Sequence, residues 1–288
     1  MRTAALIAGI VVSVVLLAAA GVLYTLAAGS NAAHYRTTIE LVRQSEQLAA
    51  AWSVETARVK ADPLADFDAL AAFLPRMARL TERLSEAALR TPDLPDRLAA
   101  EVRGYIAALA AKEERIERFK TGYAVVRNSE RFLPLAAAAV SREAQALGEV
   151  ALASTVATLL QEVSLYLATP SDEAAERLRG ELSALREASL AHPPTLANAL
   201  ANLLAHAEVL LERHTPTETL FAEATSNDVS VQADALAQSL AFERARAEAR
   251  ATLYERGMLA AIAVLALFWI GLALQSRARA ARAAPAEA

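Results

Sequence analysis

Two long apolar runs, one near each end of the chain, constrain the fold more than any other feature. Residues 4–28 and 257–274 contain no charged side chain. A helix needs roughly 18–20 apolar residues to cross the ~30 Å hydrocarbon core of a bilayer, and both runs reach that length. The sequence therefore predicts two transmembrane helices that hold the residues between them to a membrane at both ends.

Positive charges beside these runs predict the orientation. One arginine precedes the first run, and three follow the second: Arg2, then Arg277, Arg279 and Arg282. Short basic flanks stay on the cytoplasmic side, so we expect both termini in the cytoplasm and residues 29–256 outside it. A cleaved signal peptide is the alternative for the first run. That run is longer than a usual signal core, however, and Ser30-Asn31-Ala32 is a poor cleavage site.

The composition of the middle excludes several classes of protein. Between the flanks, 25 basic and 32 acidic residues leave a net charge near −7. A nucleic-acid-binding domain needs a basic surface, so we expect no nucleic-acid partner. The chain has no cysteine, so no disulfide framework holds the domain and a hydrophobic core must stabilise it.

Prolines and capping residues divide the middle into helices, and no alternating strand pattern is present. Proline is tolerated in the first turn of a helix and breaks its interior. Thr215-Pro216-Thr217-Glu218 has the form of a capping box. We expect the second helix to kink at Pro75, and the first and last to continue into the membrane spans. The predicted helices are 29–61, 66–90, 96–132, 135–168, 172–190, 195–213 and 216–256.

The helix at 96–132 has the clearest apolar stripe, with two charged residues on it. Lys112 and Glu130 fall where apolar residues are due. They indicate either a snorkelling lysine and an acid at a loose bundle end, or a polar cavity or junction between bundles. Residues 225–228 (TSND) interrupt the last long helix, as a solvated turn or as a soft point.

These patterns predict an all-α fold in which two transmembrane helices flank an elongated pair of helical bundles. Residues 132–135 (FLPL) are the expected corner between the bundles. The predicted parts are a transmembrane helix at 1–28, helical modules at 29–134 and 135–256, a second transmembrane helix at 257–274 and a basic cytoplasmic tail at 275–288.

Catalytic and metal-binding motifs are not found in the sequence. The four histidines are not in the Glu-x-x-His or His-Glu-x-x-His spacing of bundle metal sites, and no nucleophile elbow or phosphate-binding glycine loop occurs. His206 and His214 lie near Glu208 and Glu212, a pattern more typical of a solvated helix face than of a metal site. We expect no enzymatic activity, no metal and no cofactor.

Two stretches are more particular than a generic bundle. Residues 52–70 contain WSVETAR and DPLADFDAL, and residues 119–134 read FKTGYAVVRNSERFLP. Together with the two apolar runs, these stretches resemble the DAHL domain, the double all-helical ligand-binding domain of bacterial membrane sensors. The resemblance covers essentially all of residues 30–256. It implies a periplasmic sensor module anchored in the inner membrane, joined to a histidine kinase or similar output, and usually dimeric.

The chain departs from that plan after its second apolar run. Only 14 residues follow Leu274, and they contain no kinase, cyclase or coiled-coil pattern. We expect either that the chain is a fragment or that its output is a separate protein. Gly9 and Ser13 form a small-xxx-small face for helix pairing.

Polar residues within the apolar helices are the candidate ligand-binding site. Arginine presents planar forked donors to carboxylates and phosphates, and a nearby aromatic ring can complete such a site. An interhelical ion pair of Arg58 or Arg127 with Asp68, which fixes bundle register, is the structural alternative. The candidate residues are Arg58, Asp68, Tyr123, Arg127, Asn128 and Arg131.

Two functions follow from this reading. The first is a receptor in which an unknown small ligand or periplasmic protein shifts the last helix and signals to a cytoplasmic output domain or protein. The second is a structural or adaptor envelope protein whose helical rod docks another protein without any small ligand.

Overall fold

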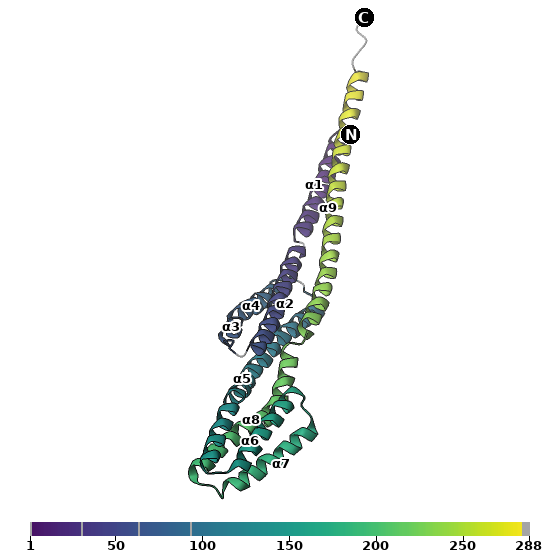
Figure 1. Cartoon of the computed structure of the whole chain (residues 1–288). Helices are drawn as coiled ribbons and strands as arrows, with labels where there is room; N and C mark the ends of the chain where they lie inside the picture. Colours follow the sequence, from purple (N-terminus) through teal and green to yellow (C-terminus); the bar gives the residue numbers. More distant parts are fainter. Residues whose placement is uncertain (1, 30, 63, 93, 284–288) are drawn as a thin grey trace. The chain divides into compact units, whose positions relative to one another are not determined.

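A computed structural model describes residues 2–29, 31–62, 64–92 and 94–283, and in this part of the chain it is all-helical, without strands. The predicted all-α fold is therefore confirmed. Met1 and residues 284–288 of the predicted tail lie outside the described residues, as do Ser30, Pro63 and Asp93. The helices (Figure 1) are α1 Arg2–Ala28, α2 Ala32–Ala61, α3 Asp68–Ala71, α4 Leu74–Leu89, α5 Asp96–Ala146, α6 Val150–Ala168, α7 Asp172–Ser189, α8 Pro194–Ala224 and α9 Asp228–Ala283.

Packing divides the chain into two compact units built from segments that are not contiguous in sequence. Unit 1 comprises Met1–Gln44, Glu82–Arg103 and Ala233–Ala288, and unit 2 comprises Ser45–Thr81 and Gly104–Gln232. The modules predicted from the sequence, 29–134 and 135–256, do not coincide with these units. The reason is that α2, α4, α5 and α9 each contribute residues to both.

A four-helix core fills one part of unit 2. Buried side chains from the second half of α5 and from α6, α7 and α8 form one apolar cluster, and Figure 1 shows these helices side by side. The cluster includes Val140 of α5, Leu159 of α6, Leu182 of α7 and Leu203 of α8. Each recurs at helical spacing with other apolar residues, so one face of each helix is buried and the other is polar.

Unit 1 brings the two apolar runs together. A Cβ atom on Gly9 of α1 would lie 3.4 Å from a ring carbon of Phe268 in α9, and one on Gly257 would lie 3.3 Å from Leu23. The indole Nε1 of Trp269 donates a hydrogen bond of 3.0 Å to Ser13 Oγ. The small residues Gly9 and Ser13 therefore face α9 of the same chain.

The predicted helix breaks at Pro134 and Pro216 are wrong. Pro134 lies inside α5 and Pro216 inside α8, and both rings are exposed. Each proline removes one intrahelical hydrogen bond, but neighbouring residues such as Leu133 and Thr217 remain buried and hold the helix on its course. The predicted capping box at Thr215 is therefore not a helix start.

The helices are instead interrupted at residues 147–149, between α5 and α6, and at residues 225–227, between α8 and α9. Gly148 has a φ of +77°, and its neighbours form a Schellman motif in which Glu149 N donates to Ala144 O at 2.8 Å and Gly148 N to Gln145 O at 3.1 Å. The polar run at 225–227 separates α8 from α9 and is a turn. This agrees with the first of the two readings of that run.

Of three further predictions about helix boundaries, two differ from the structure and one agrees with it. The first predicted helix does not continue into the span, because α1 ends at Ala28 and α2 begins at Ala32. The segment predicted at 66–90 is two helices, with Pro75 in the first turn of α4, where proline is tolerated. The last helix does continue, since α9 runs from Asp228 through residues 257–274.

Three helical stretches among the described residues have the length and composition to cross a membrane. They lie within Gly9–Ala61, Val150–Ala168 and Pro194–Ala278, and the mean hydropathy of their most apolar windows is 2.5, 1.4 and 2.5. The middle one is α6, which buries Val156, Leu159 and Val163 in the core of unit 2. Its apolar face is thus already used for packing within the protein.

Candidate functional site

Arg127 and Tyr123 of α5, two of the predicted site residues, lie together in unit 2. The Arg127 guanidinium is 4.4 Å from the centre of the Phe67 ring and 6.0 Å from that of Tyr123. Its Nη1 donates a hydrogen bond of 2.8 Å to the carbonyl oxygen of Ala65. Arg127 therefore holds Ala65 and Phe67 onto α5 through one hydrogen bond and a cation–π contact.

Tyr123 connects this arrangement to α2 and α8. Its hydroxyl donates a hydrogen bond of 2.8 Å to the carbonyl oxygen of Lys60, and its ring stacks on Phe119 at 5.3 Å. Lys60 forms an ion pair of 2.5 Å with Glu218 and lies 4.0 Å above the ring of Phe221. Burial, above all, raises the pKa of Tyr123 above its usual value, so the hydroxyl remains a donor at neutral pH.

The other four predicted residues are not gathered here. Arg58 is exposed and forms an ion pair of 2.7 Å with Glu55 of its own helix. Asp68, Asn128 and Arg131 are exposed as well. Among the described residues no ion pair joins Asp68 to Arg58 or Arg127: Arg58 is paired with Glu55, and Arg127 donates to the carbonyl oxygen of Ala65.

A second polar cluster, which we call the α8–α9 junction, surrounds Lys112 of α5. Lys112 is 2% exposed, and its Nζ donates to the carbonyl oxygens of Ala224 at 2.8 Å and Ser226 at 3.3 Å. Arg115, one turn along α5, forms an ion pair of 2.8 Å with Asp228 and donates to the carbonyl oxygen of Glu223 at 3.2 Å.

These donors satisfy carbonyl groups at the end of α8 that have no partner within the helix. Burial lowers the pKa of Lys112, while the nearby charge of Asp228 opposes that shift. Lys112 is therefore buried and is not a snorkelling lysine. It lies where α8 ends and α9 begins, and its position on the apolar stripe was the sequence signal that it is unusual.

Glu130, the other charged residue on that stripe, is half-buried. Burial raises the pKa of its carboxyl group, and the charge of Glu218 adds to the shift. His214 of α8 is also buried, and its ring lies edge-on to Tyr166 at 6.1 Å. Burial lowers the pKa of His214, which favours the neutral ring.

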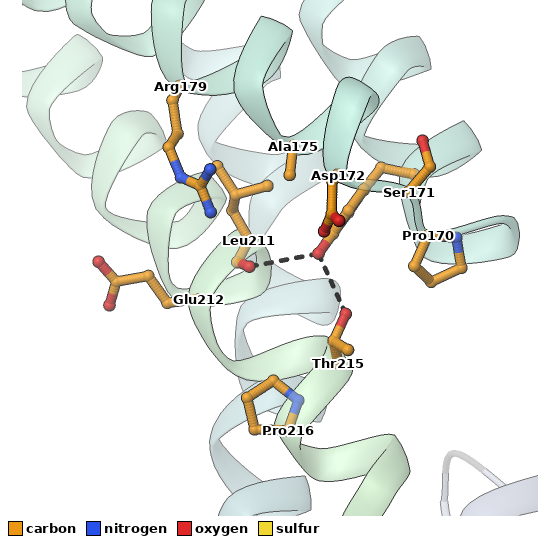
Figure 2. Close-up of a pocket in the computed structure, with 10 residues that line it drawn as sticks. Pro170, Ser171, Asp172, Ala175, Arg179, Leu211, Glu212, Thr215 and Pro216 are labelled. Atoms are coloured by element: carbon orange, nitrogen blue, oxygen red, sulfur yellow. Dashed lines mark hydrogen bonds between the residues drawn. The ribbon is translucent and has the colours of Figure 1, made fainter.

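A pocket of about 400 Å³ opens beside His214, between the end of α6, the start of α7 and the middle of α8. Figure 2 shows Arg179 and Glu212 on one side of it and Pro170 and Ser171 on the other. Its floor is polar, because the Tyr166 hydroxyl donates to the carbonyl oxygen of Leu211 at 3.4 Å and lies 3.2 Å from the Thr215 hydroxyl.

The charges around this pocket are unequal. Asp172 and Glu212 contribute two carboxylates, whereas Arg179 is paired at 2.7 Å with Glu176, outside the lining. Pro216, also in the lining, lacks the N–H that would bind the carbonyl oxygen of Glu212 in a regular helix. The pocket thus presents acceptor groups, a chemistry that favours a ligand with a cationic, hydrogen-bond-donating group.

The sequence reasoning missed this pocket. Its residues come from α6, α7, α8 and the turn at 169–171. That turn was predicted correctly, but the sequence does not specify which helices pack against one another. Across the described ranges, no group of three or more His, Asp or Glu side chains is arranged to hold a metal ion.

Comparison with known proteins gives one match. The family model described as the DAHL domain matches residues 30–255. No curated protein and no solved structure matches the chain.

Proposed function

Because the chain belongs to the DAHL domain family, whose members are all-helical sensor and ligand-binding domains, we propose that it is a membrane-anchored sensor. Its extracytoplasmic helices bind a small ligand and pass the signal through α9 to a cytoplasmic output. The matched region, residues 30–255, is bounded by the two apolar runs. Such an arrangement anchors a sensor domain on both sides.

The observation that carries this proposal is the continuity of α9. This helix runs without interruption from Asp228, beside the α8–α9 junction, through the second apolar run to Ala283. A change at the junction therefore has a covalent, hydrogen-bonded path toward the membrane. A ligand drives such a change only when it binds two states with different affinity.

The proposed topology has both termini in the cytoplasm and residues 29–256 in the periplasm of a bacterial cell, with spans near 4–28 and 257–274 in the inner membrane. It is supported by the arginines beside the runs and by the length of the apolar windows. The proposed output is a histidine kinase or similar protein, and the proposed assembly is a homodimer.

The topology is testable because the chain has no cysteine. Single-cysteine variants at the exposed residues Leu190 and Ser276 would be treated with a membrane-impermeant maleimide in spheroplasts. We expect Leu190→Cys to be labelled directly and Ser276→Cys only after lysis. The reverse pattern would refute the proposed orientation, and labelling of both in intact spheroplasts would refute the two spans.

We propose the pocket of Figure 2 as the ligand site, for a small molecule that bears an ammonium or similar cationic group. Residues of α8 line the pocket, and the same helix ends at the junction that Lys112 and Arg115 hold. A ligand that pulls on Glu212 or Thr215 therefore acts on the helix that leads to α9.

A thermal-unfolding screen of the detergent-purified full chain tests this site. Compounds that bind the native state raise its melting temperature by mass action. We expect a saturable rise with amines or amino acids, lost in Asp172→Asn and retained in Glu173→Gln. These two residues are neighbours in the first turn of α7, and only Asp172 lines the pocket. An equal response of both variants would exclude this pocket.

A second function, docking of another envelope protein, is favoured by one observation. A groove of about 750 Å³ between α5 and α8 is lined by the apolar side chains of Val125, Val209 and Leu220 and rimmed by charges. Val125 is 46% exposed there, as expected of a surface that packs against a partner helix. If no compound class raised the melting temperature, the docking function would be favoured.

A further inference from the structure

A second pocket, of about 510 Å³, lies in unit 1 where both apolar runs end. On one side it is lined by Leu26, three residues before Gly29, and by Tyr35 of α2. On the other side it is lined by Arg246, Arg250 and Tyr254 of α9. Tyr254 comes three residues before Gly257, where the second apolar run begins. The pocket therefore opens at the level where the proposed spans leave the membrane.

The pocket carries an excess of one positive charge. Arg246 forms an ion pair of 3.1 Å with Glu243, which also lines the pocket. Arg250 lies one helical turn further along, is exposed, and has no ion pair among the residues that the structure describes. One guanidinium is thus balanced by a carboxylate and the other is available to an anion, which matches the single charge of a phosphodiester.

The remaining lining suits a membrane surface. Tyr35 and Tyr254 are amphipathic, and tyrosine is enriched where helices enter the headgroup region. Leu26 is 49% exposed, so an apolar side chain borders the pocket on the side of the span. Asn31 is already bound, because its Nδ2 donates a hydrogen bond of 2.5 Å to the carbonyl oxygen of Pro92. Arg246 and Arg250 are therefore the charged donors that the pocket offers to an anion.

We propose that this pocket is a phosphate site that takes the headgroup of an anionic phospholipid. The site rests on the two membrane spans of the proposed function and adds a ligand to them. Arg250 binds the phosphate oxygens through its forked donors, and Arg246 contributes a second, partly neutralised guanidinium. A lipid bound there connects the start of α2 and residues 243–254 of α9 through the same headgroup.

Native mass spectrometry of the purified full chain tests the site, with phosphatidylglycerol as the probe. The lining variant Arg246→Gln/Arg250→Gln is compared with Arg244→Gln/Arg256→Gln, which removes the same charge from α9 at positions outside the pocket. We expect the lining variant to retain about tenfold less lipid than the wild type and the control variant to retain as much. The single variant Arg250→Lys keeps the charge, and we expect it to retain more lipid than the lining variant and less than the wild type.

The remaining outcomes show whether the bound phosphate belongs to a lipid or is free in solution. They also distinguish failure of the lipid site from failure of the proposed membrane topology. Competition by millimolar inorganic phosphate would assign the site to a soluble phosphate, and lack of competition assigns it to a lipid. Equal retention by the wild type and both double variants would overturn the site. Maleimide labelling of Leu190→Cys and Ser276→Cys, each introduced into the two double variants, shows whether the spans are inserted, so failure of the topology is distinguished from failure of the lipid site.

Discussion

Lys112 is a buried cation whose partners are backbone carbonyl oxygens. Its Nζ binds those of Ala224 and Ser226, and the nearby carboxylate of Asp228 is bound by Arg115. A buried carbonyl group that loses its donor costs about 1–3 kcal/mol. Lys112 is therefore a surface-type residue whose burial is tolerated because its ammonium group donates to two backbone carbonyl oxygens.

We expect Lys112→Met to destabilise the protein by about 1–3 kcal/mol, because methionine fills the space and donates nothing. The melting temperature of the full chain, followed by circular dichroism, measures the loss. Lys120→Met is the control, since Lys120 lies on the same helix in a half-exposed pair with Glu117, and such pairs contribute about 0–1 kcal/mol. Equal losses in the two variants would contradict the role of Lys112.

Glu130 predicts a dependence of stability on pH. Its pKa is raised in the folded protein by burial and by Glu218, so the folded state favours the protonated carboxyl group. The resulting stabilisation is complete below the unfolded value of 4.5 and is lost as the pH rises through the folded pKa. We expect Glu130→Gln to raise the melting temperature at neutral pH and to change it little at about pH 4.

Melting curves of both proteins across this pH range give the test. Glu114→Gln, at an exposed position of the same helix, should show no such divergence with pH. A Glu130→Gln variant that melts with the wild type at every pH would show that the half-buried carboxylate costs the fold nothing.

Among the helices, the break after α5 depends on one residue. Gly148 has a φ of +77°, a conformation that costs other residues roughly 1–2 kcal/mol. We expect Gly148→Ala to lower the stability by that amount. Gly180→Ala should have the opposite effect, raising it by up to about 1 kcal/mol, because Gly180 is inside α7 and an added Cβ meets nothing within 4 Å. Thermal melts of the two variants and the wild type show whether each substitution lowers or raises the stability.

The helical content was predictable from the sequence, but several helix boundaries were not. The rule that proline breaks a helix failed at Pro134 and Pro216, because tertiary packing of the flanking residues outweighs one missing hydrogen bond. The true breaks carried weaker local signals, a glycine at 148 and a short polar run at 225–227. Local propensity alone does not rank these signals against packing.

The candidate site was predictable only in part, for a related reason. Tyr123 and Arg127 are four residues apart on α5, so the 3.6-residue period places them on one face. Their contacts with Phe67 come from tertiary packing, which that period does not predict. Asn128 and Arg131 lie on exposed parts of the same helix, and Arg58 pairs with Glu55. The pocket between α6, α7 and α8 depends on which helices are neighbours, and the spacing along one helix does not contain that information.

For the whole molecule, the contact between α1 and α9 predicts how the two apolar runs pair. A Cβ atom built on Gly257 would lie 3.3 Å from Cδ1 of Leu23, so the two positions face each other and a pair of cysteines there tests the contact. We expect Leu23→Cys/Gly257→Cys to form a disulfide within one chain under mild oxidation, without a change of mass. The cysteine-free sequence makes this crosslink specific.

A pair with Val22 provides the control, because Val22 is the neighbouring residue and is 58% exposed. Val22→Cys/Gly257→Cys should crosslink much less within the chain. Species of twice the chain mass from the Leu23 pair would instead mean that these faces meet between two copies, in which case Gly9 and Ser13 belong to the interface of the proposed homodimer.

The position of the segments of unit 1 along the chain also determines when, during synthesis, this unit can fold completely. Its first segment ends at Gln44 and its last begins at Ala233, so the earliest part of the chain to leave the ribosome waits for the latest. The segments of unit 2, by contrast, all emerge before residue 233. The apolar α1 must therefore persist without its packing partner until α9 has been made, and a ribosome that stops early leaves a chain in which α1 stays unpaired.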